Sequence, residues 1–286
     1  TPGGMASVIR ILAENPPNGW VAKVVDSHST GGIYSKLVAW KTAKRAVSNS
    51  KANLIHIHCA SDWSFKRKLS IAKKARVPVV FHIHSGKFNI ECKEKLKGFH
   101  IVTLSDSWSQ KLQPLIGNST AIINPVNPLI TPGGVRKDFV LLMGRPDPVK
   151  GHDFAFSLGL SNLKVTGVNR APQGIEALGW VSEEEKLKLL QTAKVLLVPS
   201  GYEGQPMVIL EALAADCPII ASTNVPDLPD CIISIDLDDR DGWIKAIERP
   251  ICEGLLEAVE SHRIENVRKI WQGFYDEIIA SNASTE

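Results

Sequence analysis

Residues 195–221 constrain the fold of this chain more than any other stretch. The apolar run Val195–Pro199 is followed by a segment of small and polar residues, Ser200–Gln205, which is typical of a loop. Pro206 fits the first turn of a helix, where no backbone N–H is needed, and a second apolar run begins at Pro218. Apolar residues recur at helical spacing between these runs, at Met207, Leu210, Leu213 and Ala214. The stretch therefore predicts a strand, a loop, a helix and a second strand.

The same alternation continues through most of the chain and predicts parallel βαβ units, hence an α/β fold. Further strands are expected at Val21–Asp26, Leu54–His58, Pro78–His84, Ile101–Leu104, Ala121–Ile123, Phe139–Met143, Leu163–Thr166 and Cys231–Ile235. Helices are expected at Tyr34–Ser48, Trp63–Ala75, Asp106–Leu112, Gly151–Gly159, Ser182–Ala193, Asp241–Ile247 and Leu255–Ile279.

A break in this alternation predicts two domains. Asn127–Arg136 contains two Pro and two Gly and shows no periodicity, which is typical of a linker. We therefore expect an amino-terminal domain over residues 1–130 and a carboxy-terminal domain over residues 131–265. Residues 266–286 are expected to form a helix that packs back toward the first domain.

The composition favours a folded protein of a reducing compartment. Hydrophobic residues make up 44% of the chain, and no run approaches the roughly 20 apolar residues that a membrane span needs. No signal peptide is visible, and the five cysteines are scattered without metal-ligand spacing. These features predict a cytoplasmic protein without a disulfide framework.

Charge is divided unevenly along the chain. Residues 1–132 contain 18 Lys and Arg against 6 Asp and Glu, whereas the remainder contains 15 against 24. A basic half joined to an acidic half indicates domains with different partners. Anionic lipid, nucleic acid and a phosphorylated acceptor are all open at this point, as is a solvated surface without a partner.

Two carboxylates flank the loop and helix of the opening stretch. Glu203 lies in the loop and Glu211 lies two turns into the helix. A loop that enters a helix offers free backbone N–H groups and a positive dipole end, which favour a phosphate. Neighbouring carboxylates can accept hydrogen bonds from sugar hydroxyls. Phosphate and polyol together indicate a nucleotide sugar, although an ordinary helix with an exposed Glu would show a similar pattern.

The segment S-G-Y-E-G-Q-P-M-V-I-L-E-A-L-A resembles the donor-site motif of retaining glycosyltransferases of the GT-B fold, in particular family 4 (glycosyl transferases group 1). The matching residues are Glu203, Gly204, Pro206, Glu211 and Ala212. The resemblance implies two Rossmann-like domains whose parallel sheets face each other across a cleft, with the donor in the carboxy-terminal domain. It implies that Glu203 holds the sugar hydroxyls, that Glu211 holds the ribose, and that the donor also meets Gln205, Met207 and Val208.

A second motif, G-R-P-D-P-V-K-G-H-D, follows an expected strand and precedes an expected helix. Arg145 and Lys150 would therefore lie at the carboxyl end of the sheet, where open α/β folds bind ligands. Two cations there can hold a diphosphate, although surface cations in a loop are common. The motif is similar to the Arg/Lys diphosphate pair of the same family.

The chain opens on T-P-G-G-M-A-S-V, a glycine-rich turn before a helical pattern. Gly3 and Gly4 resemble the family's loop that approaches the donor phosphate. In the family a strand precedes this loop, and these residues contain no such strand. This departure leaves open a second function, a non-catalytic subunit that binds a nucleotide sugar.

Two His-x-His pairs, His56/His58 and His82/His84, each occupy one face of an expected strand. They could bind a metal as in a metal hydrolase, but no further ligands of such a pattern can be placed. We expect His56 and His58 to be core histidines. His84 precedes Ser85-Gly86, and H-I-H-S-G resembles the family segment whose final His contacts the transferred sugar.

The resemblance implies a hexosyltransferase-type enzyme that moves a sugar from a nucleotide-sugar donor to a glycan or lipid-linked saccharide, as in polysaccharide biosynthesis. It implies retention of configuration, with Arg145 and Lys150 stabilising the leaving diphosphate and Glu203 and His84 positioning the sugar. No metal and no cofactor is expected. A nucleotide-sugar epimerase of the same fold is an alternative. The sugar, the nucleobase and the acceptor are not specified by the sequence.

A basic helix in the amino-terminal half predicts a surface partner. Phe65, Leu69 and Ala72 are expected to face inward. The outward basic residues would be Lys66, Arg67, Lys68, Lys73 and Lys74. We expect this helix to bind an anionic membrane peripherally and expect no nucleic-acid partner; a solvated helix face is the alternative.

Overall fold

The computed structural model describes residues 3–60, 62–85 and 92–283. The chain divides into two compact units: Thr1–Pro125 with Glu265–Glu286, and Val126–Ile264. The first boundary falls at Pro125 rather than at residue 130, and the carboxy-terminal segment belongs to the first unit. Each unit is described by itself.

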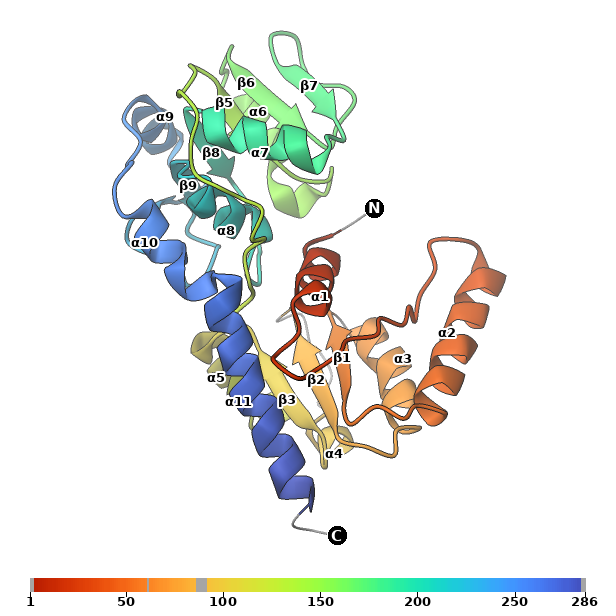
Figure 1. Ribbon diagram of the computed structural model, residues 1–286. Coiled ribbons are helices and arrows are strands. Elements are labelled where there is room, and N and C mark those ends of the chain that lie inside the picture. The colour runs from red at the N-terminus through yellow and green to blue at the C-terminus, as the bar shows by residue number, and fades with distance from the viewer. Residues whose placement is uncertain (1–2, 61, 86–91, 284–286) are drawn as a thin grey trace. The chain divides into compact units, whose positions relative to one another are not determined.

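The first unit contains a four-stranded parallel sheet in the order β1-β2-β3-β4 (Figure 1). Its strands are β1 (Ile55–Cys59), β2 (Val79–Ile83), β3 (His100–Thr103) and β4 (Thr120–Ala121). Its helices are α1 (Gly4–Glu14), α2 (Ile33–Ser48), α3 (Asp62–Ala72), α4 (Lys93–Leu96), α5 (Asp106–Ile116) and α11 (Ile264–Ala283).

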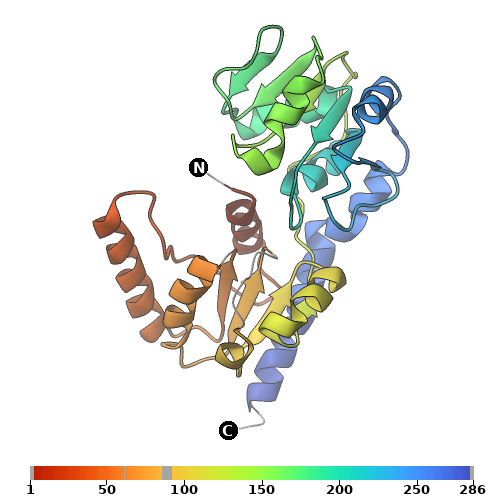
Figure 2. The ribbon, with the colours of Figure 1, turned by 180° about the vertical axis from the view of Figure 1, so that it is seen from behind.

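Helices cover both faces of this sheet, as its apolar strands require. On one face, Val80 and Val102 pack against Val267 and Trp271 of α11. On the other face, Phe81 meets Phe65 of α3, with 5.8 Å between the ring centroids. Figure 2 shows α2 beside α3, and Trp40 of α2 donates a hydrogen bond of 2.9 Å to Ser70 Oγ.

Two of the expected elements are wrong. Val21–Asp26 forms no strand, and Val21 is 94% exposed. A strand needs a neighbour for its backbone N–H and C=O groups, and no described segment pairs with this one. The expected helix Leu255–Ile279 is broken into α10 (Leu255–Val259), the short 3₁₀ turn η2 (Glu260–His262) and α11, because Arg263 adopts an extended backbone.

The second unit contains a six-stranded parallel sheet in the order β10-β9-β8-β5-β6-β7. Its strands are β5 (Val140–Leu142), β6 (Leu163–Thr166), β7 (Glu176–Gly179), β8 (Val195–Val198), β9 (Ile219–Ser222) and β10 (Ile233–Ile235). Besides α10 and η2, its helices are η1 (Pro148–Lys150), α6 (His152–Ser157), α7 (Glu183–Thr192), α8 (Met207–Ala214) and α9 (Arg240–Glu248).

The strand order of this sheet predicts the position of a ligand site. The chain leaves β5 toward β6 and β7 on one side, then returns to β8, β9 and β10 on the other. In open α/β sheets, ligands bind outside the carboxyl ends of the strands where the order reverses. That point lies between β5 and β8, so the loops that follow these two strands define the candidate site.

Candidate functional site

Two neighbouring loops form the carboxyl edge of the sheet at the reversal point. The β5 loop (residues 143–151) carries Arg145 and Lys150, and the β8 loop (residues 199–206) carries Glu203. The Gly201 N–H donates to the Val149 carbonyl oxygen at 2.8 Å. This bond joins the backbones of the two loops and holds their side chains close together.

Lys150 and Glu203 form an ion pair across these loops. Lys150 Nζ lies 2.5 Å from Glu203 Oε1, and the side chains are 24% and 12% exposed. Ser200 Oγ donates a hydrogen bond of 2.8 Å to the same carboxylate oxygen, and Ser222 Oγ donates to the Ser200 carbonyl oxygen at 2.5 Å. The carboxylate is thus fixed at the edge of the sheet. The sequence analysis selected neither serine, although Ser200 opens the quoted motif of Glu203; Ser222 stands outside it.

Arg145 does not join this pair in the structure. Its guanidinium Nη2 lies 3.0 Å from Asp147 Oδ2, and its side chain is 64% exposed. Asp147 also caps η1 by accepting a hydrogen bond of 3.1 Å from the Val149 N–H. This backbone hydrogen bond, followed by the charge of Arg145, lowers the pKa of Asp147. Sequence reasoning placed the two cations on one loop but did not identify Asp147 as the partner of Arg145.

Glu211 is held by a lysine that the sequence analysis did not select. Its carboxylate oxygen Oε1 accepts from Lys186 Nζ of α7 at 2.8 Å, and Glu211 is buried. Lys186 also lies 2.8 Å from Glu183 Oε2. Burial opposes the charge of Lys186, but the carboxylates of Glu211 and Glu183 outweigh it and raise the pKa of Lys186. An inward lysine on an acidic helix leaves no distinct sequence signal.

The remaining predicted donor residues lie where the β8 loop enters α8. Pro206 is the N-cap residue of α8, one position before the first turn in which it was expected. Gly204, Gln205 and Val208 are half-buried, whereas Pro206 and Met207 are buried. The loop therefore delivers the amino end of α8 to the same edge of the sheet.

Gly151 is the residue that lets the β5 loop lie against β8. It adopts a left-handed backbone conformation with φ of +70°. A Cβ at this position would come within 2.0 Å of the Pro199 carbonyl oxygen. Only glycine fits both conditions. The fold therefore requires the glycine of the K-G-H segment at position 151.

The predicted site residues of the first unit belong to two elements, the start of α1 and the end of β2. Gly3 is the N-cap residue of α1 and Gly4 its first residue. His84 follows β2 and lies 2.9 Å from His58 Nδ1 through its Nε2 atom. His56 and His58, expected to be core histidines, are half-buried and belong to the same group of rings.

The expected basic face of α3 needs a correction. Lys66, Lys73 and Lys74 are exposed, but Arg67 and Lys68 are half-buried. Lys68 Nζ donates a hydrogen bond to the His58 carbonyl oxygen, because the helix rotates this residue toward β1. Phe65, Leu69 and Ala72 are buried as predicted.

Part of the second unit is similar to a known family. Residues 158–253, which include Lys186, Glu203 and Glu211, match the family model described as Glycosyl transferases group 1. An uncharacterized glycosyltransferase of Methanocaldococcus jannaschii is 25% identical over 262 residues, covering 82% of this chain and 73% of the relative. Both findings support a glycosyltransferase.

Two solved structures are similar to this chain in fold. Sucrose-phosphate synthase from Thermosynechococcus elongatus matches with a TM-score of 0.77 and 16% identity, over 98% of this chain and 94% of that one. HepE from Anabaena, in complex with UDP and glucose, matches with a TM-score of 0.72 and 11% identity, over 97% of both chains. This chain therefore has the GT-B fold that the resemblance implied.

Within the described residues, no helix combines the length and the apolar character needed to cross a bilayer.

Proposed function

We propose that this chain transfers a sugar from a nucleotide-sugar donor to a glycan or lipid-linked acceptor. The observation that carries the proposal is the Lys150–Glu203 pair, which lies at the reversal point of the second sheet. An ammonium there can meet a diphosphate oxygen, and a fixed carboxylate can accept hydrogen bonds from sugar hydroxyls. The complex of HepE with UDP and glucose is consistent with such a donor.

In this proposal, two cationic side chains and the amino end of a helix bind the diphosphate of the donor. Lys150 has three donors, of which Glu203 takes one. Arg145 is mostly exposed and reaches the diphosphate by leaving Asp147, an exchange of one anionic partner for another. The amino end of α8, from Gln205 to Val208, adds backbone N–H groups and a favourable dipole.

The sugar and the ribose are held by the two glutamates. Glu203, fixed by Ser200 and Lys150, orients the transferred sugar. Glu211 accepts from the ribose hydroxyls while Lys186 keeps the carboxylate in place. Positioning and charge stabilisation then lower the barrier without a covalent intermediate on the protein.

The reaction that we propose retains the anomeric configuration and needs no metal or cofactor at the donor site. The acceptor hydroxyl attacks from the face that the diphosphate leaves, and a donor phosphate oxygen takes the acceptor proton. Lys150 and Arg145 neutralise the charge that grows on the diphosphate. His84, at the carboxyl end of β2, contacts the transferred sugar in this proposal.

We further propose that the first unit binds an anionic membrane peripherally, where a lipid-linked acceptor would be reached. Lys66 is exposed on α3, and Lys73 and Lys74 are exposed directly after its end. The Lys66 ammonium lies 5.3 Å from the centre of the exposed Trp63 ring. The neighbouring helix α2 exposes Ile33 and Tyr34. Basic residues beside exposed aromatic ones match the charge and the interfacial character of a bilayer surface.

A product assay tests the proposed reaction. Nucleotide sugars that raise the thermal stability of the protein identify the donor, because a ligand of the folded state stabilises it. Incubation of that donor with candidate acceptors, in the presence of a chelator, is expected to give a glycosylated product with retained anomeric coupling in proton spectra. Release of free sugar alone would favour the epimerase, donor binding without any product the non-catalytic subunit, and an inverted product would contradict the proposed chemistry.

A further inference from the structure

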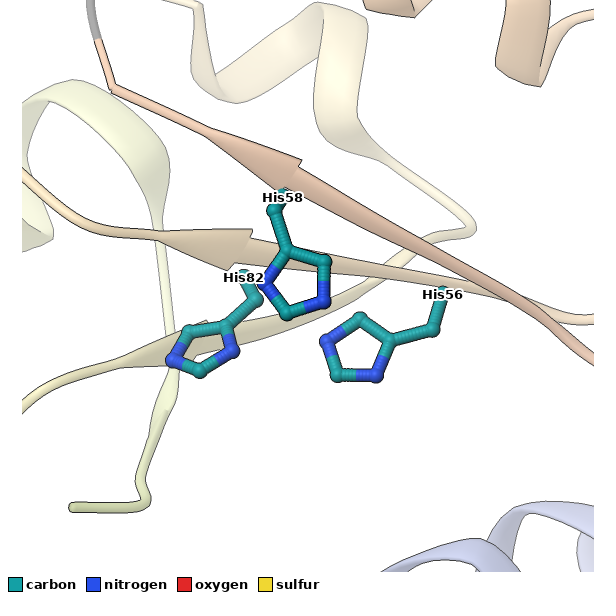
Figure 3. A group of neighbouring side chains, drawn as sticks. All are labelled: His56, His58 and His82. Atoms are coloured by element: carbon teal, nitrogen blue, oxygen red, sulfur yellow. The ribbon is translucent and has the colours of Figure 1, made fainter. Parts of the chain in front are cut away.

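Three histidines gather on one face of the first sheet. His56 and His58 lie two residues apart on β1 and therefore share a face. His82 on β2 is the direct register partner of His58. Figure 3 shows the three rings side by side below the two strands. The parallel pairing of β1 with β2 thus brings together three imidazoles that lie 26 residues apart or less in the sequence.

The ring nitrogens of this histidine cluster (His56, His58 and His82) are close enough to share one ion. One ring nitrogen from each residue lies within 4.8 Å of the others. His82 is completely buried, and neither of its ring nitrogens has a hydrogen-bond partner among the described residues. The Nε2 atom of His56 is also buried without a partner in that part of the chain. Buried polar atoms without partners are costly, and a bound ion would satisfy the Nε2 atom of His56 and one ring nitrogen of His82.

Neighbouring side chains hold the opposite ring nitrogens. His56 Nδ1 lies 2.7 Å from the Tyr275 hydroxyl of α11, and His58 Nδ1 lies 2.9 Å from His84 Nε2. These contacts fix the ring orientations and leave the Nε2 atoms of His56 and His58 for another ligand. Metal-binding histidines are oriented in the same way, by a hydrogen bond at the second ring nitrogen.

We propose that His56, His58 and His82 form a binding site for a transition-metal ion of the zinc class. Three imidazole nitrogens suit Zn²⁺, Ni²⁺ or Cu²⁺, whereas Mg²⁺ and Ca²⁺ prefer oxygen ligands. Zinc binds imidazole nitrogen at about 2.0–2.1 Å, so the rings move closer together when the ion enters. A water molecule completes the coordination, as in open three-histidine zinc sites.

One nearby charge opposes the ion. Lys68 donates to the His58 carbonyl oxygen, so its ammonium lies close to the cluster. A zinc-bound water ionises at a pKa near 7, and the resulting hydroxide reduces the positive charge of the site. The alternative is a metal-free stack of neutral rings, in which His56 and His58 lie parallel with 4.2 Å between their centroids.

Titration of the metal-stripped chain with Zn²⁺ decides between these two states. We expect one equivalent to bind in calorimetry, and His56→Gln to lower the affinity by at least tenfold. Because a substitution in the cluster can disturb folding, Tyr275→Phe is the second variant. It removes only the hydroxyl that orients His56 and is expected to weaken binding about 10- to 100-fold, as loss of an orienting partner does.

The matched control is His100→Gln, which changes a half-buried histidine of β3 in the same sheet. It is expected to leave the affinity for Zn²⁺ unchanged, with circular dichroism confirming that all variants fold. The proposal is overturned if the unaltered chain binds no Zn²⁺, Ni²⁺ or Cu²⁺ stoichiometrically. It is equally overturned if folded His56→Gln and Tyr275→Phe bind Zn²⁺ as tightly as the unaltered chain, or if only His100→Gln weakens binding.

Discussion

The side chains at the edge of the second sheet differ in how firmly they are held. Glu203 receives both Lys150 and Ser200 and is nearly buried. Arg145 is exposed and bound to one carboxylate of its own loop. Glu211 lies deeper and is paired with Lys186. The structure therefore holds Glu203 and Glu211 in place, whereas in our proposal Arg145 changes partner when a diphosphate binds.

Replacing Lys186 with Ala is expected to destabilise the second unit. The substitution leaves the buried Glu211 without this partner, and loss of one member of a buried ion pair costs about 3 kcal/mol at the lower end of its range. Urea denaturation measures the change in the free energy of unfolding. Lys188→Ala, an exposed position on the same helix, is the control and is expected to have little effect. Equal stabilities of the two variants would contradict a structural role for the Lys186–Glu211 pair.

The buried histidines of the first unit predict acid sensitivity. Burial lowers the pKa values of His56 and His84 to about 3, whereas the unfolded chain takes up protons near pH 6.5. Between these values the unfolded state binds more protons, so stability falls as the pH falls from 6.5. Each such histidine contributes at most about 1.4 kcal/mol per pH unit. Denaturation in metal-free buffer at pH 7.0 and 5.5 measures this effect, and equal stabilities at both values would contradict it.

At the level of elements, the contact between the β5 loop and the end of β8 sets the geometry of the site. Gly151 combines a positive φ with a close approach to the Pro199 carbonyl oxygen. The Gly201 N–H bonds to Val149 a few residues away. Two elements that are distant in sequence are thereby locked together at their carboxyl ends.

Gly151→Ala is expected to destabilise the second unit by roughly 2–5 kcal/mol. About 1–2 kcal/mol arises from the left-handed backbone, and overpacking against Pro199 adds about 1–3 kcal/mol. Gly159→Ala is the matched control, because Gly159 has a similar φ of +73° but no atom within 4 Å of its would-be Cβ. Thermal or urea unfolding compares the two. Equal losses in both variants would show that the contact with Pro199 adds nothing.

Sequence periodicity located most elements because buried parallel strands are short, uniformly apolar runs. The strand at Leu163–Thr166 and the capped helix after Ser182 are such cases, and both are confirmed. Val21–Asp26 has the composition of a strand but no pairing partner among the described residues. The helix break at Arg263 is not marked by Gly or Pro, and the apolar spacing continues across it. The sequence therefore predicted one uninterrupted helix.

The sequence pointed to candidate site residues that stand in a motif. It did not point to residues whose role depends only on contacts in the folded chain. Glu203, Lys150 and Glu211 stand in motifs that resemble a known family. Lys186 stands outside these motifs and meets Glu211 through a contact between residues distant in sequence. Ser200 lies within the Glu203 motif and Ser222 outside it, but neither residue carries a sequence signal that predicts its hydrogen bond. The pairing of Arg145 with Asp147 depends on a cap of only three residues, η1, which periodicity cannot detect.

The chain is divided into two parts both in its fold and in the distribution of its charged residues. The chain forms two compact units, and residues 1–132 contain three times as many basic as acidic residues. The acidic remainder contains the loops that we assign to the donor. A basic surface on the first unit gives that unit a separate task, for which an anionic membrane is our proposal.

Vesicle sedimentation tests the membrane surface. The protein is expected to sediment with anionic vesicles at low salt and to be released at high salt, because surface charges are screened within a Debye length. Each basic residue near the surface contributes about 1 kcal/mol, so a triple Lys66, Lys73 and Lys74 to Ala variant should lose most of the binding. A triple Lys93, Lys95 and Lys97 to Ala variant is the charge-matched control. Negligible binding of the unaltered protein to anionic vesicles at low salt would leave a soluble acceptor as the better proposal.

Calorimetry with UDP, GDP and ADP tests whether the Lys150–Glu203 pair lies in a nucleotide-sugar site. A charge-assisted hydrogen bond contributes about 1.5–3 kcal/mol, so Lys150→Ala should weaken the affinity for the preferred nucleotide roughly 10- to 100-fold. Lys194→Ala is the control, because Lys194 precedes β8 at the opposite edge of the sheet and pairs with Asp138. The account predicts a loss in Lys150→Ala and none in Lys194→Ala. Unchanged affinity in folded Lys150→Ala would contradict it.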